Sequence, residues 1–318
     1  MTNSASLPPD EDLTEVRKPT SLLIAQFFLF PLIIIGICIG LFLLFGYLTY
    51  DQRTAEEYLD KVGGGAGTQR WQAAYELSHL VKKNPDRART PEFVESLINA
   101  YRNSPDQDIL VRSYLALILG ELKDRSAIPV LVEGLNREER LKSTDWTQEG
   151  FLGWVFRPSL DEIARDLAQS QIYALFALGS IGDNSAVPGV LEQVQNRDGL
   201  VRKVAAWVLG MLGDPRAVEP LRPLLNDKEE DVRWYAALAL AQLGNGEGAD
   251  LLIKLLDHGY VDTLPDMTAE QKTELIVNAV KGLGILKYEP ALERIRALSE
   301  NDPVPAVRSA ALEALKKF

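Results

Sequence analysis

The sequence is poor in cysteine, histidine and positive charge. Its 318 residues include one Cys and two His, and 34 Lys and Arg stand against 45 Asp and Glu, for a net charge of −11. One cysteine excludes a disulfide-stapled fold, and so few thiol and imidazole groups cannot supply the ligands of a usual zinc site. Affinity for nucleic-acid phosphates comes from clustered cations. The acidic balance therefore predicts that nucleic acid is not a partner.

No arrangement of catalytic side chains stands out either. The two histidines, His79 and His258, fall in the first and fifth copies of the repeat described below, too far apart along the chain's stack to meet. The carboxylates are scattered over polar stretches, and no pair is set in apolar surroundings that would tune it for acid–base work. We therefore expect no catalytic residue, no metal ligand and no cofactor site, and hence a protein that is not an enzyme.

Apolar residues form one long run, from Leu22 to Leu48, in which Gln26 is the one clearly polar side chain. About 20 apolar residues suffice to cross the hydrocarbon core of a membrane as a helix. The run is too long for the apolar part of a cleavable signal peptide and has no small-residue cleavage site after it. The sequence therefore predicts a membrane-spanning helix over 21–50, membrane contact through residues 22–48, and a single-pass protein of the cell membrane.

Lys and Arg near the ends of this run predict its orientation. Arg17 and Lys18 precede the run, and Arg53 and Lys61 follow it. Together with the chain amine, the residues before the run carry a narrow excess of positive charge. Because positive charge stays on the cytoplasmic side, this favours a cytoplasmic N-terminus and an extracytoplasmic C-terminal part.

Two glycines in the run, Gly36 and Gly40, form a GxxxG pair with Cys38 between them as a small apolar residue. Such a pair lets two helix backbones approach closely, which would support helix packing and a weak homodimer. The alternative is that they reflect the general frequency of glycine in spanning helices.

Polar segments flank the apolar run. Residues 1–20 hold Ser, Pro and an acidic cluster without apolar periodicity, which predicts a disordered tail. Residues 51–68 end in a glycine cluster from Gly63 to Gly67. A phosphate-binding loop would need a preceding strand and a following Lys-Ser or Lys-Thr, but Thr68 and Gln69 follow. The segment is therefore predicted to be a linker with a flexible glycine-rich hinge.

The remaining chain, residues 69–318, repeats. The hexads LGSIGD, LGMLGD and LAQLGN start at 178, 209 and 240, so that both steps are 31 residues. Weaker copies start at 77, 119 and 283, and a Val-Arg pair keeps the same phase in four copies. The outer steps are longer than 31 because they contain insertions. The sequence thus holds about six copies and a terminal half copy.

Each copy has the pattern of two helices. From Val201 to Leu212 the apolar residues follow helical spacing, and Gly213 supplies a left-handed stop. A second apolar helix is predicted from Ala217 to Leu225. Strands are not expected, since nothing of useful length alternates with period 2. Each pair leaves an apolar face that only the next pair can cover, which predicts an all-α solenoid.

The repeat resembles a known family. The motif DxVRxxAAxxLGxLGDxxAVxPLxxLL, from Asp198 to Leu225 and with changes from Asp231 to Leu256, is similar to the short HEAT-like repeats named after the phycobilisome bilin lyases. The resemblance implies a HEAT-like α-solenoid of about six and a half repeats behind the apolar helix. It does not carry over lyase activity, because the repeats lack cysteine and any further lyase feature. It also implies ladders between repeats, rather than ligand binding, for Arg112, Arg202, Arg233, Arg308, Asp183 and Asp214.

Two insertions, near 136–168 and near 258–271, interrupt the repeats on the same edge. The first contains DWTQEGFLGWVFRP, an aromatic density unusual for a solvated loop. Aromatic side chains are favoured as anchors at protein interfaces, so that partner binding is one interpretation. The other is that the rings fold back on the solenoid as a cap. The candidate partner-binding residues are Trp146, Phe151, Trp154 and Phe156.

These features favour binding over catalysis. We expect a membrane-tethered scaffold or adaptor, an accessory subunit of a membrane-associated assembly, with a membrane-associated protein as its partner. The alternative is a solenoid that binds a small hydrophobic ligand or chromophore, with lyase-like activity. The repeat alone does not decide, because HEAT-like repeats serve scaffolds, adaptors and a few enzymes.

Overall fold

The computed structural model describes residues 29–49, 54–65, 67–105, 108–136, 160–265 and 267–318, and for 45–49 and 160–166 the backbone alone. Within these ranges the chain is helical and has no strand. The predicted all-α fold is therefore confirmed. The chain divides into two compact units, Met1–Arg53 and Thr54–Phe318.

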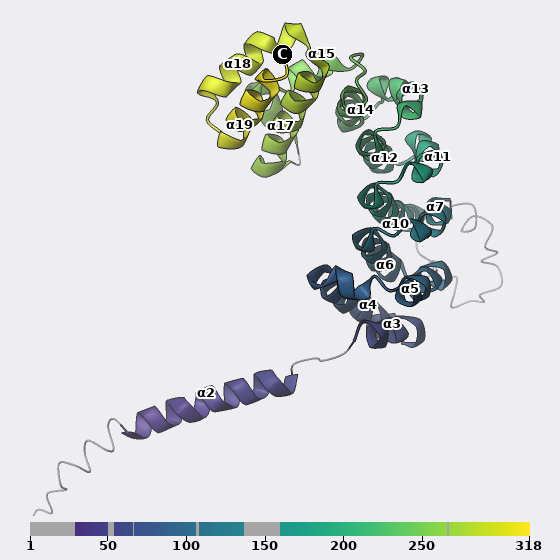
Figure 1. Ribbon diagram of the computed structural model, residues 1–318, viewed down its shortest axis with the longest axis vertical. Coiled ribbons are helices and arrows are strands. Elements are labelled where there is room, and N and C mark those ends of the chain that lie inside the picture. The colour runs from purple at the N-terminus through teal and green to yellow at the C-terminus, as the bar shows by residue number, and fades with distance from the viewer. Residues whose placement is uncertain (1–28, 50–53, 66, 106–107, 137–159, 266) are drawn as a thin grey trace, which may run out of the picture. The chain divides into compact units, whose positions relative to one another are not determined.

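In the second unit the helices form stacked pairs (Figure 1). The first helix of each pair packs against the first helix of the next, from α4 through α14 and again from α14 to α17 and α19. The first helices are α4 (Gly67–Lys83), α6 (Ile109–Leu122), α10 (Leu160–Ile181), α12 (Gly199–Leu212), α14 (Glu230–Gln242), α17 (Ala269–Leu286) and α19 (Pro305–Leu315). The second helices are α5 (Pro91–Asn103), α7 (Ile128–Leu135), α11 (Val187–Leu191), α13 (Val218–Leu221), α15 (Ala249–Lys254) and α18 (Leu292–Asn301).

A tight turn joins the two helices of a pair. Gly213 ends α12 with a φ of +68°, a left-handed conformation that costs glycine least. Asp214 follows, and its Oδ1 accepts a hydrogen bond from the backbone N–H of Arg216 at 2.9 Å, which caps the next short turn. The stop position has a positive φ in five copies, at Lys123, Gly182, Gly213, Gly244 and Lys287.

The other glycine of the motif lets neighbouring first helices approach closely. A Cβ at Gly120 would lie 2.7 Å from the Cα of Ala177, and one at Gly210 would lie 2.8 Å from the Cα of Ala239. Side chains cannot be that close, so the first helices touch backbone to backbone at these points. The glycine is therefore a packing requirement between repeats.

The core is a row of apolar layers. Buried side chains from α3 (Ala55–Gly64) to α14 form one cluster, and those from α14 to α19 form a second. α14 contributes to both, with Val232 and Leu240 in the first and Trp234 and Leu238 in the second. Each pair thus covers the apolar face of its neighbour, as expected for a solenoid.

The segment predicted as a linker differs in the structure. Residues Ala55–Gly64 form the helix α3, in which Tyr58, Leu59 and Val62 are buried, and this helix packs on α4 and α5. These three side chains have helical spacing and form an apolar stripe. The burial of this stripe outweighs the helix-weakening glycines, which stand at the C-terminal end of α3.

In the first unit, residues Phe30–Thr49 form the helix α2. No helix among the described residues has both the length and the apolar character needed to cross a membrane. The predicted membrane-spanning helix over 21–50, the single-pass cell-membrane location and the extracytoplasmic solenoid were therefore wrong. Of the apolar run from Leu22 to Leu48, the structure describes a helix from Phe30 on.

Other predicted segments lie partly beyond the described residues. The tail, 1–20, and most of the first insertion, 137–159, lie outside them. The second insertion contains a short helix, α16 (His258–Asp262), and the beginning of α17.

Candidate functional site

One repeat position leaves apolar side chains on the surface of four successive first helices. Tyr75, Leu117, Phe176 and Trp207 occupy it in α4, α6, α10 and α12, and their spacings of 42, 59 and 31 residues match the steps of the repeat. Tyr75 and Leu117 are 39% and 38% exposed, whereas Phe176 and Trp207 are half-buried. We call these four residues, together with His79 and Tyr114, the aromatic strip.

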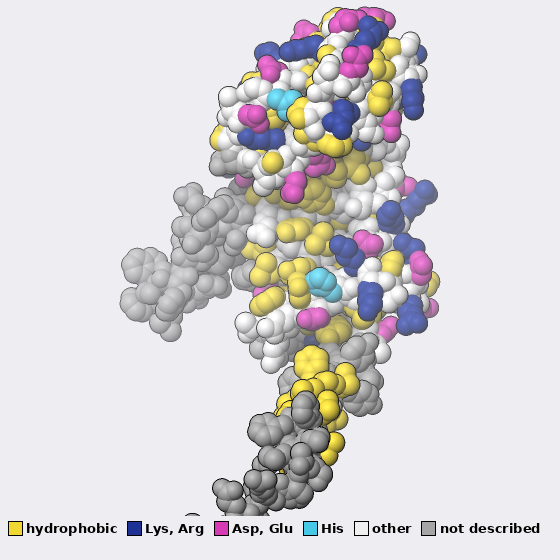
Figure 2. Space-filling model, turned by 90° about the vertical axis from the view of Figure 1, so that its left-hand side faces the viewer, with side chains coloured by type: hydrophobic (Ala, Val, Ile, Leu, Met, Phe, Trp, Pro, Cys, Tyr) yellow, Lys and Arg dark blue, Asp and Glu magenta, His cyan; other side chains and the backbone are white. Residues whose placement is uncertain are grey.

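Ring contacts connect the strip across the helices. The centroids of Tyr75 and Tyr114 lie 5.6 Å apart, and those of Phe176 and Trp207 lie 5.5 Å apart, both edge to face. Tyr75 also contacts His79, at 4.5 Å. Edge-to-face contacts fix the rings while leaving part of each exposed. Figure 2 shows hydrophobic side chains along the middle of one face of the stack.

A groove of about 300 Å³ opens in the strip among α4, α6 and α10. Its volume is at the lower end of that of small-molecule pockets, about 300–1,000 Å³. Its apolar part includes Tyr114, Leu117 and Phe176 of the strip. Its polar part consists of Ser78, His79, Lys82, Glu121 and Ser180.

Cations gather beside the groove, at the turns of the first two pairs. Lys82 and Lys83 lie in the last turn of α4, Arg87 lies in the following turn, and Lys123 ends α6. All four are exposed, and none of them forms an ion pair with another described residue. We call them the basic edge. On the face shown in Figure 2, Lys and Arg side chains, with Asp and Glu among them, lie along one side of the hydrophobic ones.

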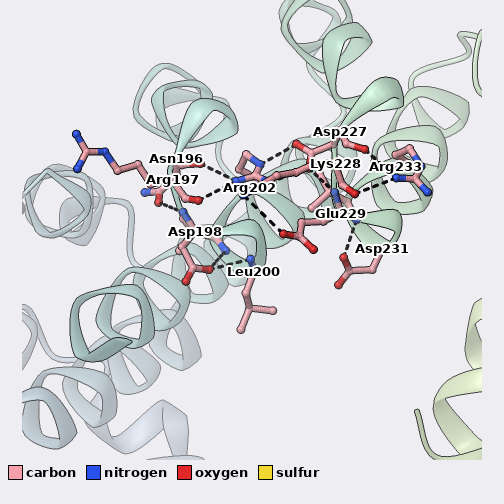
Figure 3. Close-up of polar contacts among 12 residues, drawn as sticks. Asn196, Arg197, Asp198, Leu200, Arg202, Asp227, Lys228, Glu229, Asp231 and Arg233 are labelled. Atoms are coloured by element: carbon pink, nitrogen blue, oxygen red, sulfur yellow. Dashed lines mark hydrogen bonds and ion pairs between the residues drawn. The ribbon is translucent and has the colours of Figure 1, made fainter. Parts of the chain in front are cut away.

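Arginines of the Val-Arg motif form hydrogen bonds to the loops that connect one helix pair to the next (Figure 3). We call these loops the connections. The Nη1 of Arg202 donates to the carbonyl oxygens of Asn196 and Arg197 at 2.9 and 3.1 Å. Arg233 and Arg308 donate in the same way to the carbonyl oxygens six and five residues before them. Arg112 is 2% exposed, and its guanidinium lies 5.1 Å from the centroid of the Tyr101 ring. That these arginines form a ladder along the whole stack stays a prediction.

Arg202 also reaches the following connection. Its Nε and Nη2 donate to the two carboxylate oxygens of Asp227 at 2.8 and 2.7 Å, and the two side chains are 7% and 9% exposed. The hydrogen bonds from Arg202 hold the pKa of the Asp227 carboxyl below its usual range. This bidentate pair joins two successive connections by their side chains.

Sequence reasoning missed two members of this set. Gln171 stands 31 residues before Arg202; its Nε2 donates to the carbonyl oxygen of Leu135 at 2.8 Å, and its Oε1 accepts from Asn196 at 3.2 Å. Arg70 stands 42 residues before Arg112, donates to the carbonyl oxygen of Val62 at 2.8 Å and pairs with Asp108. Both residues occupy the repeat position of the arginines, so an alignment of the copies by position, whatever the residue type, would have identified them.

The two predicted aspartates lie in the turns within pairs. Asp183 accepts from the backbone N–H of Ser185 at 2.9 Å and forms an ion pair with Arg125 of the preceding turn at 2.8 Å. Asp214 binds Arg216, whose Nη2 donates to the carbonyl oxygen of Asn184 at 3.4 Å. Both residues thus cap a local turn and take part in a contact to the preceding turn.

The two histidines have separate roles. His79 belongs to the strip, whereas the Nε2 of His258 lies 2.7 Å from Oδ2 of Asp302 and joins α16 to the connection before α19. In the part of the chain that the structure describes, no group of three His, Cys, Asp or Glu side chains could hold a metal ion.

Some predicted site residues stay untested. Trp146, Phe151, Trp154 and Phe156 lie outside the described residues. On α2, a Cβ at Gly36 or Gly40 would meet no atom of the chain within 4 Å. Whether these glycines pack against another helix stays a prediction.

Sequence profiles identify the repeats. A profile of HEAT repeats matches residues 160–233 and 191–269, and one of the PBS lyase HEAT-like repeat matches residues 111–137. No curated protein sequence gives a significant match. HEAT-like repeats of the predicted type are therefore present in this chain.

Several solved structures are similar to this chain at low sequence identity. The complex of CpcE and CpcF of phycocyanin lyase from Nostoc sp. PCC7120 is 20% identical, with a TM-score of 0.51 over 84% of this chain and 88% of that chain. A HEAT-like repeats protein from the archaeon Thermococcus onnurineus NA1 is 13% identical, with a TM-score of 0.36 over 84% and 97% of the two chains. A designed armadillo repeat protein in complex with the peptide (KR)4 is 15% identical, with a TM-score of 0.39 over 84% and 100%. At 20% identity the likeness to the phycocyanin lyase complex shows the fold alone. The chain is an all-α solenoid that contains HEAT-like repeats.

Proposed function

We propose that the chain is a protein-interaction scaffold or adaptor that binds a partner protein through the aromatic strip. The observation that carries this proposal is the strip itself, in which the side chains at one repeat position are exposed on two successive helices and half-buried on the next two, beside a groove. Aromatic residues are preferred anchors at interfaces. The HEAT-like repeats support the proposal, because stacked repeats present extended binding surfaces.

The exposure of the strip is not forced by the fold. In α14 the same repeat position is Leu238, whose side chain is 5% exposed. Leu117 at that position in α6 is 38% exposed. Since the solenoid can bury a leucine here, the exposed part of the strip favours a role outside the core.

A photo-crosslinking amino acid at position 117 tests the proposal, with position 312 as its control. Leu312 lies on α19 and is 52% exposed, so that it matches Leu117 in type and accessibility. We expect one protein to be crosslinked from 117 and not from 312 in cells of the native source. The additional substitution Tyr75→Ala should reduce that crosslink. Equal adducts from both positions, or none from 117, would refute the proposal.

We further propose that the predicted aromatic anchors of the first insertion contact the same partner protein as the aromatic strip. A crosslinker at Trp154 should reach the same partner as one at Leu117 if the insertion binds it. If the insertion instead caps the solenoid, the crosslink from 154 will be intramolecular.

Binding of a small hydrophobic ligand or chromophore is the second candidate function. Aromatic side chains line the groove, and a phycocyanin lyase complex shares the fold. Absorption by the purified protein above the bands of Trp and Tyr would favour this candidate, and lyase-like activity would then be tested on the bound chromophore. A spectrum of Trp and Tyr alone would favour the scaffold.

A further inference from the structure

We infer that the groove of the aromatic strip and the basic edge together recognise an acidic segment of a partner protein that carries apolar or aromatic anchors. This inference rests on the proposed scaffold function and adds the chemical class of the partner. The groove supplies the apolar half of the site, and the basic edge supplies the charged half.

The two halves are adjacent in the structure. Lys82 belongs to the basic edge and also lines the groove. Lys82 and Lys83 stand three and four residues after His79 on α4, a spacing that places side chains on one helical face. An anchor seated against Leu117 or Phe176 would therefore bring its flanking residues toward these cations.

The charge of the basic edge is not neutralised within the described chain. Lys82, Lys83, Arg87 and Lys123 are exposed and form no ion pair with another described residue. Of the neighbouring acids, Asp86 pairs with Arg89 and Asp183 pairs with Arg125. Asp124 accepts from Ser126, and Glu121 lines the groove; both keep their negative charge. In a chain of net charge −11, such a cluster attracts an acidic segment and repels a basic one.

The attraction between a cation and the negative C-terminal end of a helix dipole explains only part of the basic edge. That effect applies to Lys82 and Lys83 in the last turn of α4. It does not apply to Arg87, which lies in the following turn. Lys123 occupies the left-handed stop, where three other copies have glycine. Lysine also stands at this stop in one other copy, at Lys287.

A protein segment fits the site better than a nucleic acid. The groove needs an apolar side chain to fill it, and Glu121 lies on its lining. A phosphate backbone requires a longer row of cations, as an oligonucleotide is held by several contacts. We therefore commit to an acidic peptide segment, and nucleic acid becomes an outcome of the test.

Three fluorescent peptides of about 14 residues test the inference by anisotropy with the full chain. The acidic probe combines Glu with Leu and Phe at helical spacing. The basic probe has Lys in place of each Glu, and the polar probe has Ser in place of each Leu and Phe. We expect the acidic probe to bind about tenfold more tightly than either of the others. Its affinity should fall as NaCl is raised from about 50 to 300 mM.

The variant Lys82→Glu with Lys123→Glu should weaken the acidic probe about fivefold or more, through charge repulsion. Lys287→Glu is the control for the Lys123→Glu half of this variant, because Lys287 occupies the same left-handed stop at the end of α17. We expect this control to change the affinity less than about twofold.

Three results would overturn the inference: a basic probe that binds as tightly as the acidic one, equal losses in the two variants, or tighter binding of a single-stranded oligonucleotide. If one of these occurs while position 117 still crosslinks a partner, the partner class is wrong and the scaffold function stands. If the probes behave as expected but position 117 crosslinks nothing, the charge preference of the groove stands and the scaffold function fails.

Discussion

Arg202 shows how one side chain can join neighbouring repeats. Its guanidinium bonds the connection before its own helix through two carbonyl oxygens and the following connection through Asp227. Burial makes such a pair costly to break, since the remaining charge would be left without its partner. An exposed pair with the same distance does little, because water screens it.

At this scale we predict that Arg202→Ala lowers the free energy of unfolding by about 3–5 kcal/mol. The control is Arg296→Ala, which breaks an exposed pair with Glu293 and should cost less than about 1 kcal/mol. Arg296 and Glu293 are 51% and 79% exposed. Urea titrations of the variants measure both values, and similar losses would contradict the role assigned to Arg202.

The pH dependence of stability follows from Asp227. Its pKa in the folded chain is lowered from 3.8 by the hydrogen bonds from Arg202. A lowered folded pKa contributes stability that is present above the unfolded pKa and is lost as pH falls through the folded pKa. We therefore expect the wild type to lose more stability between about pH 6 and pH 3 than Asp227→Asn does. All other carboxyls are common to the two proteins, so equal losses would show that Asp227 does not contribute.

At the scale of the helix, close approach matters more than helix propensity. A Cβ at Gly210 would lie 2.8 Å from the Cα of Ala239, whereas one at Gly63 in α3 would meet no atom within 4 Å. We expect Gly210→Ala to cost about 1–3 kcal/mol through overpacking. We expect Gly63→Ala to be neutral or to stabilise by up to about 1 kcal/mol, through the higher helix propensity of alanine.

Thermal unfolding followed by circular dichroism measures these two effects. If Gly210→Ala melts at or above the temperature of the wild type, the first helices can move apart at no cost, and the glycine is then not a packing requirement.

At the scale of the whole second unit, stability should be local, because each pair mainly contacts its neighbours. Leu115 belongs to the first core cluster and Leu283 to the second, and both are fully buried. We expect Leu283→Ala to reduce amide protection in α17–α19 more than in α4–α10, and Leu115→Ala to show the reverse. Hydrogen exchange with mass spectrometry measures the pattern. A uniform loss of protection in either variant would indicate that the unit unfolds in one step.

The sequence predicted much of the repeat and little of the site. The Gly213-Asp214 pair identified the turn because its conformational preference acts within a few residues. Helix α3 forms within the segment predicted as a linker because Tyr58, Leu59 and Val62 are buried against other helices, which the glycine cluster after Val62 does not indicate. The membrane prediction relied on the length of an apolar run. The aromatic strip was missed, although its residues follow the steps of the repeat, because the pattern does not say which apolar positions stay exposed.

The sequence by itself determined the helix pairs, their turns and their period, since apolar spacing, glycine stops and aspartate caps act over short distances along the chain. Only the tertiary structure decided that Leu117 stays exposed while Leu238 is buried, that Arg202 meets Asp227, and that Lys82 lines one groove with Leu117 and Phe176. These relations depend on how closely successive helices approach, and that approach is set by packing between residues tens of positions apart.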